Sequence, residues 1–268
     1  DDRFYFTCAA FFEQRLIDYL TYRSNGAAGV SIVNRSDDWG ALALNGPKSR
    51  DILGACSNAP LDNAAFPWLG VRQIEIEGRP MWAFRMSYAG ELGWELHGPH
   101  KHLLSVYNAL FDAGAPYGIA DYGSFAMNAM RMEKMFKGAG ELTNEVTLPE
   151  ADVMRFVRLD KPDFVGKAAT QAALAKPLSW ICAYLEIETD GDSDGHGGEA
   201  VLAEGVCIGS TSSVAFGHGV QKLLAFAYLK PQYGEPGTKL EVMIMGEPRP
   251  AVVLGAPVYD PANKRPRA

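Results

Sequence analysis

The sequence contains no run of about 18 consecutive apolar residues, the length that a helix needs to cross a bilayer. It also has no basic segment that leads into an apolar run near its start, which is the pattern of a secretory signal. Its four cysteines, Cys8, Cys56, Cys182 and Cys207, lie far apart and form no C-x-x-C pair. We therefore expect no membrane partner, no zinc knuckle and no redox dithiol, but reduced thiols in a cytoplasm-like compartment.

Positive charge is also scarce. The sequence has 25 Lys and Arg residues and 32 Asp and Glu residues, which gives a net charge of −7 at pH 7. No cluster of basic residues offsets this balance. An acidic protein repels a phosphate backbone, so nucleic acid is not expected as a partner. The remaining composition, with 47% hydrophobic and 21% charged residues, is that of an ordinary globular protein.

The familiar nucleotide and hydrolase motifs are missing. Gly138-Ala139-Gly140 lacks the third glycine of a dinucleotide-binding fingerprint and does not follow a predicted strand. The sequence has no G-x-x-x-x-G-K-S/T phosphate loop and no G-x-S-x-G nucleophile elbow. It therefore predicts neither a flavin, nicotinamide or nucleotide site of its own nor a serine hydrolase.

Two groups of residues have the chemistry of metal ligands without the matching pattern. The segment 190–195 resembles the opening of a calcium loop, but its twelfth position is Val201 where a bidentate Glu is needed, so we expect a solvated hairpin connection. His97, His100 and His102 fall at a strand end and a helix start, which point side chains in different directions. No metal site is predicted.

Residues 1–175 mix helical and strand patterns. The apolar spacing predicts helices at Ala9–Ser24, Lys48–Ala55, His102–Ala113 and Tyr122–Phe136. Strands are predicted at Arg3–Thr7, Val30–Asn34, Trp39–Leu44, Arg72–Glu77, Met81–Tyr88 and Gly93–His97, with a hairpin turn at Gly78-Arg79-Pro80. This part is therefore expected to be an α+β region.

Residues 176–268 change character and read as strands separated by Gly and Pro. The predicted strands are Trp180–Glu188, Ala200–Gly209, Leu223–Leu229, Lys239–Met245 and Ala251–Leu254. We expect a small separate β-barrel or sandwich here. At the other end, Asp1 and Asp2 directly precede a predicted strand without an initiator Met, so we also expect the chain to be the later part of a longer polypeptide.

The most informative segment is 87–96, Ser-Tyr-Ala-Gly-Glu-Leu-Gly-Trp-Glu-Leu, in which two glycines interrupt a strand. Along a regular strand Glu91 and Glu95 share one face and Trp94 takes the other, unless the break at Gly93 rotates the chain. A carboxylate beside aromatic rings suits the N–H and amino donors of a flat heterocycle such as a pterin. Spacing alone favours a simpler alternative, a bulged hairpin with two solvated glutamates.

The segment from Tyr88 to Glu95 resembles a motif of the folate-dependent aminomethyltransferase, or glycine-cleavage T-protein, superfamily. Five further stretches resemble segments of that superfamily in the same order: 39–50, 126–134, 163–167, 217–220 and 258–261. Met127 stands where T-proteins have Arg, as in the folate-binding half of dimethylglycine and sarcosine dehydrogenases. The resemblance covers nearly the whole chain and implies a T-protein-like folate-binding domain, incomplete at its N-terminus, followed by a C-terminal β-barrel.

The resemblance also implies roles for particular residues. Glu95 is expected to accept hydrogen bonds from the pterin ring of tetrahydrofolate, and Tyr88 to line the same pocket. Arg131 and Glu133 are expected to support helix packing. The family's catalytic aspartate is expected upstream of Asp1, so no catalytic residue is assigned, and Asp1 and Asp2 are not placed in that role.

The implied function is capture of a one-carbon unit from an oxidatively demethylated N-methyl amine as 5,10-methylenetetrahydrofolate. The implied partner is a flavin dehydrogenase domain or subunit that carries FAD, and the fragment alone is expected to bind folate weakly and to lack oxidase activity. Two alternatives stay open: the folate module of another methylamine, amine-oxide or methyl-sulfur demethylase, and a structural or regulatory relative with a vestigial cleft. The expected location is the cytoplasm, or the mitochondrial matrix in a eukaryote.

Overall fold

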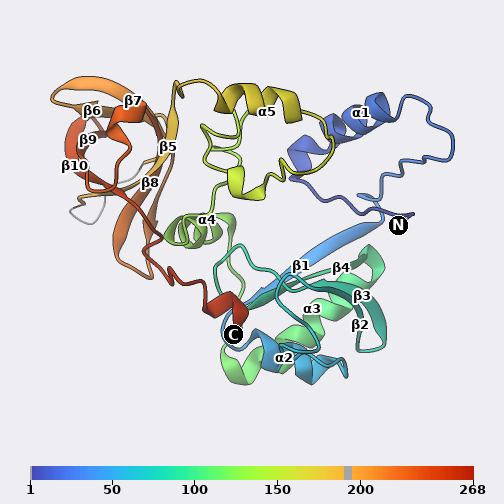
Figure 1. Cartoon of the computed structure of the whole chain (residues 1–268). Helices are drawn as coiled ribbons and strands as arrows, with labels where there is room; N and C mark the ends of the chain where they lie inside the picture. The colour runs from blue at the N-terminus through green and yellow to red at the C-terminus, as the bar shows by residue number, and fades with distance from the viewer. Residues whose placement is uncertain (1, 190–194) are drawn as a thin grey trace.

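The computed structural model describes residues 2–189 and 195–268, so Asp1 and most of the acidic loop 190–195 lie outside the described residues. The chain forms a sheet with helices, a closed barrel and connecting segments between them (Figure 1). None of the helices in the described ranges is long and apolar enough to span a membrane.

The first body is built on a four-stranded antiparallel sheet in the order β1-β4-β3-β2. Its strands are β1 (Trp39–Asn45), β2 (Val71–Ile76), β3 (Arg79–Phe84) and β4 (Gly93–Pro99). Helices α2 (Ser49–Cys56) and α3 (His100–Gly114) cover one face of the sheet (Figure 1). Alternate residues of β4, Trp94 and Leu96, are fully buried in the core between that face and the helices, which leaves Glu95 and His97 on the opposite face.

The hairpin between β2 and β3 forms as predicted, but its turn lies one residue earlier. Ile76 pairs with Arg79, so the loop consists of Glu77 and Gly78 alone. Both have positive φ, 49° and 72°, the conformation of the two-residue turn that matches strand twist. Pro80 therefore belongs to β3 and pairs with Glu75.

The second body is a barrel, not a sandwich. Its strands close in the order β10-β5-β8-β7-β6-β9. They are β5 (Ile181–Ile187), β6 (Ala200–Ala203), β7 (Val206–Gly217), β8 (Lys222–Leu229), β9 (Lys239–Ile244) and β10 (Glu247–Leu254). The predicted strand 200–209 is divided, because Glu204 and Gly205 take positive φ and form a turn between β6 and β7.

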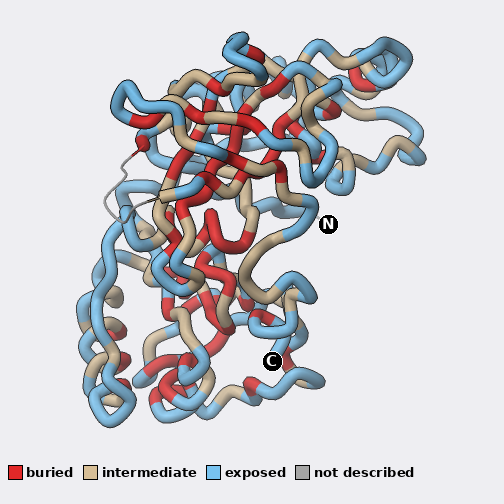
Figure 2. Tube along the Cα trace, turned by 90° about the vertical axis from the view of Figure 1, so that its left-hand side faces the viewer, coloured by how far each residue is buried: buried red, intermediate tan, exposed pale blue. Residues whose placement is uncertain are grey.

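Helix α4 (Ser124–Glu133) lies between the barrel and the sheet (Figure 1). Met132 of α4 packs with Cys182, Tyr184, Leu224 and Phe226 on the outside of the barrel. Strand β5 is consequently buried on both faces, since Ala183, Leu185 and Ile187 fill the barrel interior. Buried residues run through both bodies in Figure 2. The predicted boundary between residues 175 and 176 stays a prediction.

Two other predicted strands are wrong. Arg3–Thr7 and Val30–Asn34 have no regular secondary structure and are exposed. Their apolar residues fit a strand locally, but in the described residues neither segment is paired in the sheet or in the barrel. Between them, the predicted helix 9–24 is present as a short 3-10 turn (Ala10–Phe12) followed by α1 (Glu13–Ser24). A further helix, α5 (Lys167–Leu174), precedes the barrel.

Candidate functional site

The segment with the predicted pterin-binding residues spans the connection between β3 and β4, which holds Tyr88, and the start of β4, which holds Glu95. Strand β3 ends at Phe84, four residues before the predicted end at Tyr88, and β4 starts at Gly93. Gly90 has a φ of 77° and packs against the Lys134 side chain, while Gly93 packs against the Asn45 side chain. A Cβ atom at either glycine would collide with these neighbours, so both glycines are needed for the close approach of the chain.

Glu91 and Glu95 do not lie on one regular strand, because Glu91 precedes β4, which starts at Gly93. The Glu91 carboxylate accepts hydrogen bonds from the Tyr259 hydroxyl and from the Arg265 guanidinium, the latter at 3.0 Å. Burial, followed by the bond to Glu91, raises the pKa of Tyr259 to about 12. Glu91 therefore links the motif to the C-terminal segment and is not available to a ligand.

Glu95 lies on the sheet face opposite the core, and 35% of its side chain is exposed. Its Oε2 atom lies 3.2 Å from Nε2 of His97, and Nδ1 of His97 lies 3.1 Å from the Tyr5 hydroxyl. The Glu95 Oε1 atom has no hydrogen-bond partner among the residues that the structure describes. A Tyr-His-Glu chain thus holds one carboxylate oxygen and leaves the other available to accept a bond.

Aromatic residues lie near this carboxylate, since Phe84 is the cross-strand partner of Glu95. The His97 ring lies 4.6 Å from the Phe84 ring and 5.8 Å from the Tyr5 ring, between ring centroids. Burial, followed by the negative charge of Glu95, raises the pKa of Tyr5. The pKa of Tyr122 is also raised, chiefly by burial and further by Glu95. Glu95 is therefore close enough to both phenols to act on them electrostatically.

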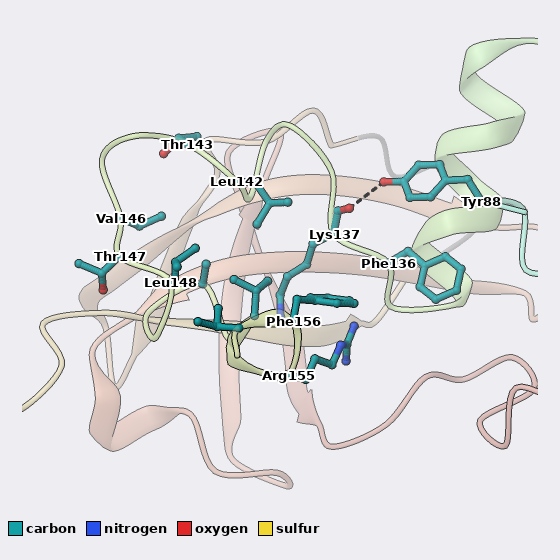
Figure 3. Close-up of a pocket in the computed structure, with 13 residues that line it drawn as sticks. Tyr88, Phe136, Lys137, Leu142, Thr143, Val146, Thr147, Leu148, Arg155 and Phe156 are labelled. Carbon is teal, nitrogen blue, oxygen red and sulfur yellow. Dashed lines mark hydrogen bonds between the residues drawn. The ribbon is translucent and has the colours of Figure 1, made fainter. Parts of the chain in front are cut away.

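Tyr88 lines a cavity of about 490 Å³ between the motif and the loop 136–157 (Figure 3). Its ring is stacked on Phe136 with centroids 6.0 Å apart and an interplanar angle of 15°. Its hydroxyl donates a 2.9 Å hydrogen bond to the Lys137 carbonyl, and burial raises its pKa. Glu95 is not among the residues that line this cavity. The two predicted ligand-binding residues therefore occupy adjacent parts of one segment and not a single cavity.

Arg131 and Glu133 are engaged within the protein, as expected for residues that support packing. Nη1 of Arg131 lies 2.8 Å from the fully buried Glu141 carboxylate, which also accepts a bond from Ser212 of β7. Glu133 accepts a 2.6 Å bond from the Gly219 amide in the β7–β8 turn. These contacts fasten α4 and the loop after it to the barrel.

Sequence reasoning missed three residues beside Glu95, namely Tyr5, His97 and Tyr122, as part of a ligand site. Tyr5 was predicted to lie in a strand, and His97 was considered only as a metal ligand. His97 stands two residues after Glu95 on one strand face, a spacing that could have indicated their contact. In the described residues, no three His, Cys, Asp or Glu side chains are grouped so that they could hold a metal ion.

The chain matches two family models in the order that the fold requires. Residues 1–161 match the GCVT N-terminal domain, and residues 182–260 match the glycine cleavage T-protein C-terminal barrel domain. The chain therefore belongs to the glycine cleavage T-protein family, and its fold is the α+β T-protein-like domain followed by a β-barrel. This agrees with the resemblance found in the motif 88–95.

The chain is also similar in sequence to individual dehydrogenases. It is 37% identical over 244 residues to human mitochondrial dimethylglycine dehydrogenase, a match that covers 90% of this chain and 28% of that protein. It is 32% identical to mouse mitochondrial sarcosine dehydrogenase, covering 87% of this chain and 26% of that protein. The chain thus spans about a quarter of the length of these relatives.

A solved structure has the same fold. The crystal structure of glycine cleavage system aminomethyltransferase T from Bartonella henselae superposes with a TM-score of 0.80 at 20% sequence identity, covering 94% of this chain and 67% of that chain. At this identity the likeness concerns the fold alone.

Proposed function

We propose that this chain is a tetrahydrofolate-binding module that captures a one-carbon unit from an oxidatively demethylated N-methyl amine as 5,10-methylenetetrahydrofolate. The observation that carries the proposal is the carboxylate of Glu95, which lies 3.2 Å from His97 and whose cross-strand partner is Phe84. Adjacent N–H and amino donors on a pterin edge match an acceptor of this kind. The family membership and the two dehydrogenase relatives support the same function.

The residues of the site fit such a ligand. The available Oε1 atom of Glu95 would accept a hydrogen bond from the pterin edge, while His97 restrains the carboxylate through Oε2. Phe84 and the rings of Tyr5 and Tyr122 would supply flat apolar surface beside the ligand. When bound, tetrahydrofolate supplies two amine nitrogens that take up the one-carbon unit. Holding the ligand in one orientation favours that condensation over escape of the carbon to water.

The donor of the carbon unit is proposed to be a dimethylglycine- or sarcosine-type methylamine, oxidised by a flavin domain or subunit that carries FAD. Support comes from two of the relatives, which are dehydrogenases of dimethylglycine and of sarcosine. No catalytic residue is assigned within this chain. We also propose a location in the cytoplasm, or in the mitochondrial matrix in a eukaryote, and the two mitochondrial relatives support the second of these.

The proposal is tested by titrating tetrahydrofolate into the full-length protein and its Glu95→Gln variant. Loss of a charge-assisted hydrogen bond predicts a dissociation constant that rises roughly 10- to 100-fold. Glu75→Gln, an exposed change on β2 of the same sheet, is the matched control and should leave the constant unchanged. Equal affinity of the wild type and Glu95→Gln would remove the pterin role from Glu95.

A further inference from the structure

The cavity beside Tyr88 has predominantly apolar walls. Its lining comes from the Tyr88–Phe136 stack and the loop after it, and the apolar side chains include Phe136, Leu142, Leu148, Val153 and Phe156. A cavity of about 490 Å³ is in the range that accommodates a flat, drug-sized group. Glu95 does not line this cavity, so the proposed pterin contact does not assign a role to it.

Two cationic side chains reach the cavity, and they differ in their partners. Lys137 is neutralised, because its Nζ atom lies 2.9 Å from the Asp152 carboxylate. Arg155 makes no hydrogen bond or ion pair with any residue in the described ranges, and its guanidinium lies 4.8 Å from the centre of the Phe156 ring (Figure 3). Its planar set of N–H donors is therefore available to an anion.

An apolar cavity with an unpaired guanidinium fits a ligand that carries both an aromatic ring and a carboxylate. Guanidinium groups bind carboxylates through two parallel hydrogen bonds, and a flat ring can stack on Phe156 or Phe136. The protein carries a net charge of −7, so an acidic ligand is repelled unless a specific cation receives it. Arg155 is placed to be that cation.

We infer that Arg155 receives the glutamate carboxylate of folate, with the aminobenzoyl ring in the apolar cavity beside Tyr88. The inference rests on the proposed folate binding. The two binding positions belong to one stretch of chain, because Tyr88 lines the cavity and Glu95 follows it in the segment 88–95. Arg155 is thus a specificity-determining residue that distinguishes folates from pterin compounds without the glutamate.

The experiment compares tetrahydrofolate with tetrahydropteroate, which lacks the glutamate, by calorimetric titration into the full-length protein. The wild type should bind tetrahydrofolate roughly fivefold to tenfold more tightly than tetrahydropteroate. Arg155→Gln should reduce the affinity for tetrahydrofolate to that for tetrahydropteroate and leave the latter unchanged. Arg72→Gln is the matched control, since Arg72 is an exposed Arg that also lies over a Phe ring, on β2.

The outcomes separate the two proposals. If both compounds bind, Glu95→Gln weakens both, and Arg155→Gln keeps the wild-type preference for the glutamate, the inference about Arg155 is overturned and the proposed function stands. If neither compound binds to the wild type, both proposals fail. A loss of preference that Arg72→Gln reproduces also overturns the inference, because it reflects net charge and not contact.

Discussion

Nε2 of His97 lies 3.2 Å from Oε2 of Glu95, and the two side chains stand on the same face of β4. His97 is buried, whereas Glu95 is partly exposed. The imidazole is held from its other side by the Tyr5 hydroxyl at 3.1 Å. His97 therefore restricts the orientations of the carboxylate that we propose as the pterin acceptor.

Replacing His97 with Phe should weaken tetrahydrofolate binding indirectly, because His97 orients Glu95 and does not itself contact the ligand. The variant keeps an aromatic ring but removes the bond that holds Oε2, so the dissociation constant should rise about fivefold to tenfold, less than for Glu95→Gln. Calorimetric titration measures it. His218→Phe, the same change at an exposed histidine of the barrel, should bind as the wild type does. An unchanged constant for His97→Phe would show that Glu95 needs no positioning.

The sequence predicted strand β4, which carries Glu95 and His97, but not the contacts of the site. Gly93–His97 could be recognised as a strand because apolar residues alternate with polar ones. The position of Tyr5 could not be predicted. Tyr5 lies in a segment without regular secondary structure, and its contact His97 is 92 positions away in the sequence. Glu91 was misplaced for the same reason, because its partners Tyr259 and Arg265 come from the end of the chain.

The barrel was easier to predict than the N-terminal segment. Each barrel strand pairs with two neighbours in the closed order, so the segments with a strand-like apolar pattern do form strands. The residues 3–7 have a comparable apolar pattern but are not paired in a sheet in the described part of the chain, and local propensity is then overridden. Helix α4 was predicted within two or three residues at each end.

Breaking the buried ion pair between Arg131 and Glu141 should be strongly destabilising. Glu141 is fully buried and also accepts bonds from the Gly138 amide and the Ser212 hydroxyl. Glu141→Ala leaves the Arg131 charge buried without its partner, which costs about 3–5 kcal/mol of unfolding free energy. Chemical denaturation measures the loss. Asp160→Ala, which removes the exposed partner of Arg158, should leave the free energy of unfolding unchanged.

The stability of the barrel should fall at alkaline pH because of Cys182. Burial raises the pKa of this thiol to about 12 from an ordinary value of 9.0. The folded protein keeps the proton while the unfolded chain loses it, so the stabilisation is fully present below pH 9 and declines as the pH rises towards about 12. Denaturation at a series of pH values should give a shallower decline for Cys182→Ala than for the wild type. Cys207→Ala, which removes an exposed thiol of β7, should keep the wild-type slope.

The turn that carries Tyr88 depends on Gly90. Ala at this position destabilises the fold in two ways. The backbone φ of 77° disfavours a residue with a Cβ atom, and the Cβ atom collides with the Lys134 side chain. Gly205→Ala in the β6–β7 turn has only the first effect, since its φ is 76° and no atom lies within 4 Å of the added Cβ. Gly205→Ala should cost about 1 kcal/mol and Gly90→Ala roughly 2–3 kcal/mol, measured by denaturation.

The difference between these two variants isolates the contact with Lys134. Lys134 is buried, and its Nζ atom lies 3.2 Å from the Asp260 carboxylate, so its stem has little room to retreat. Moving it also disturbs the segment that holds Glu91 through Tyr259. Gly90→Ala should therefore weaken tetrahydrofolate binding as well, because Tyr88 and Glu95 flank the displaced turn. Equal costs for both glycine variants would mean that Lys134 yields freely and that Gly90 is required for its φ alone.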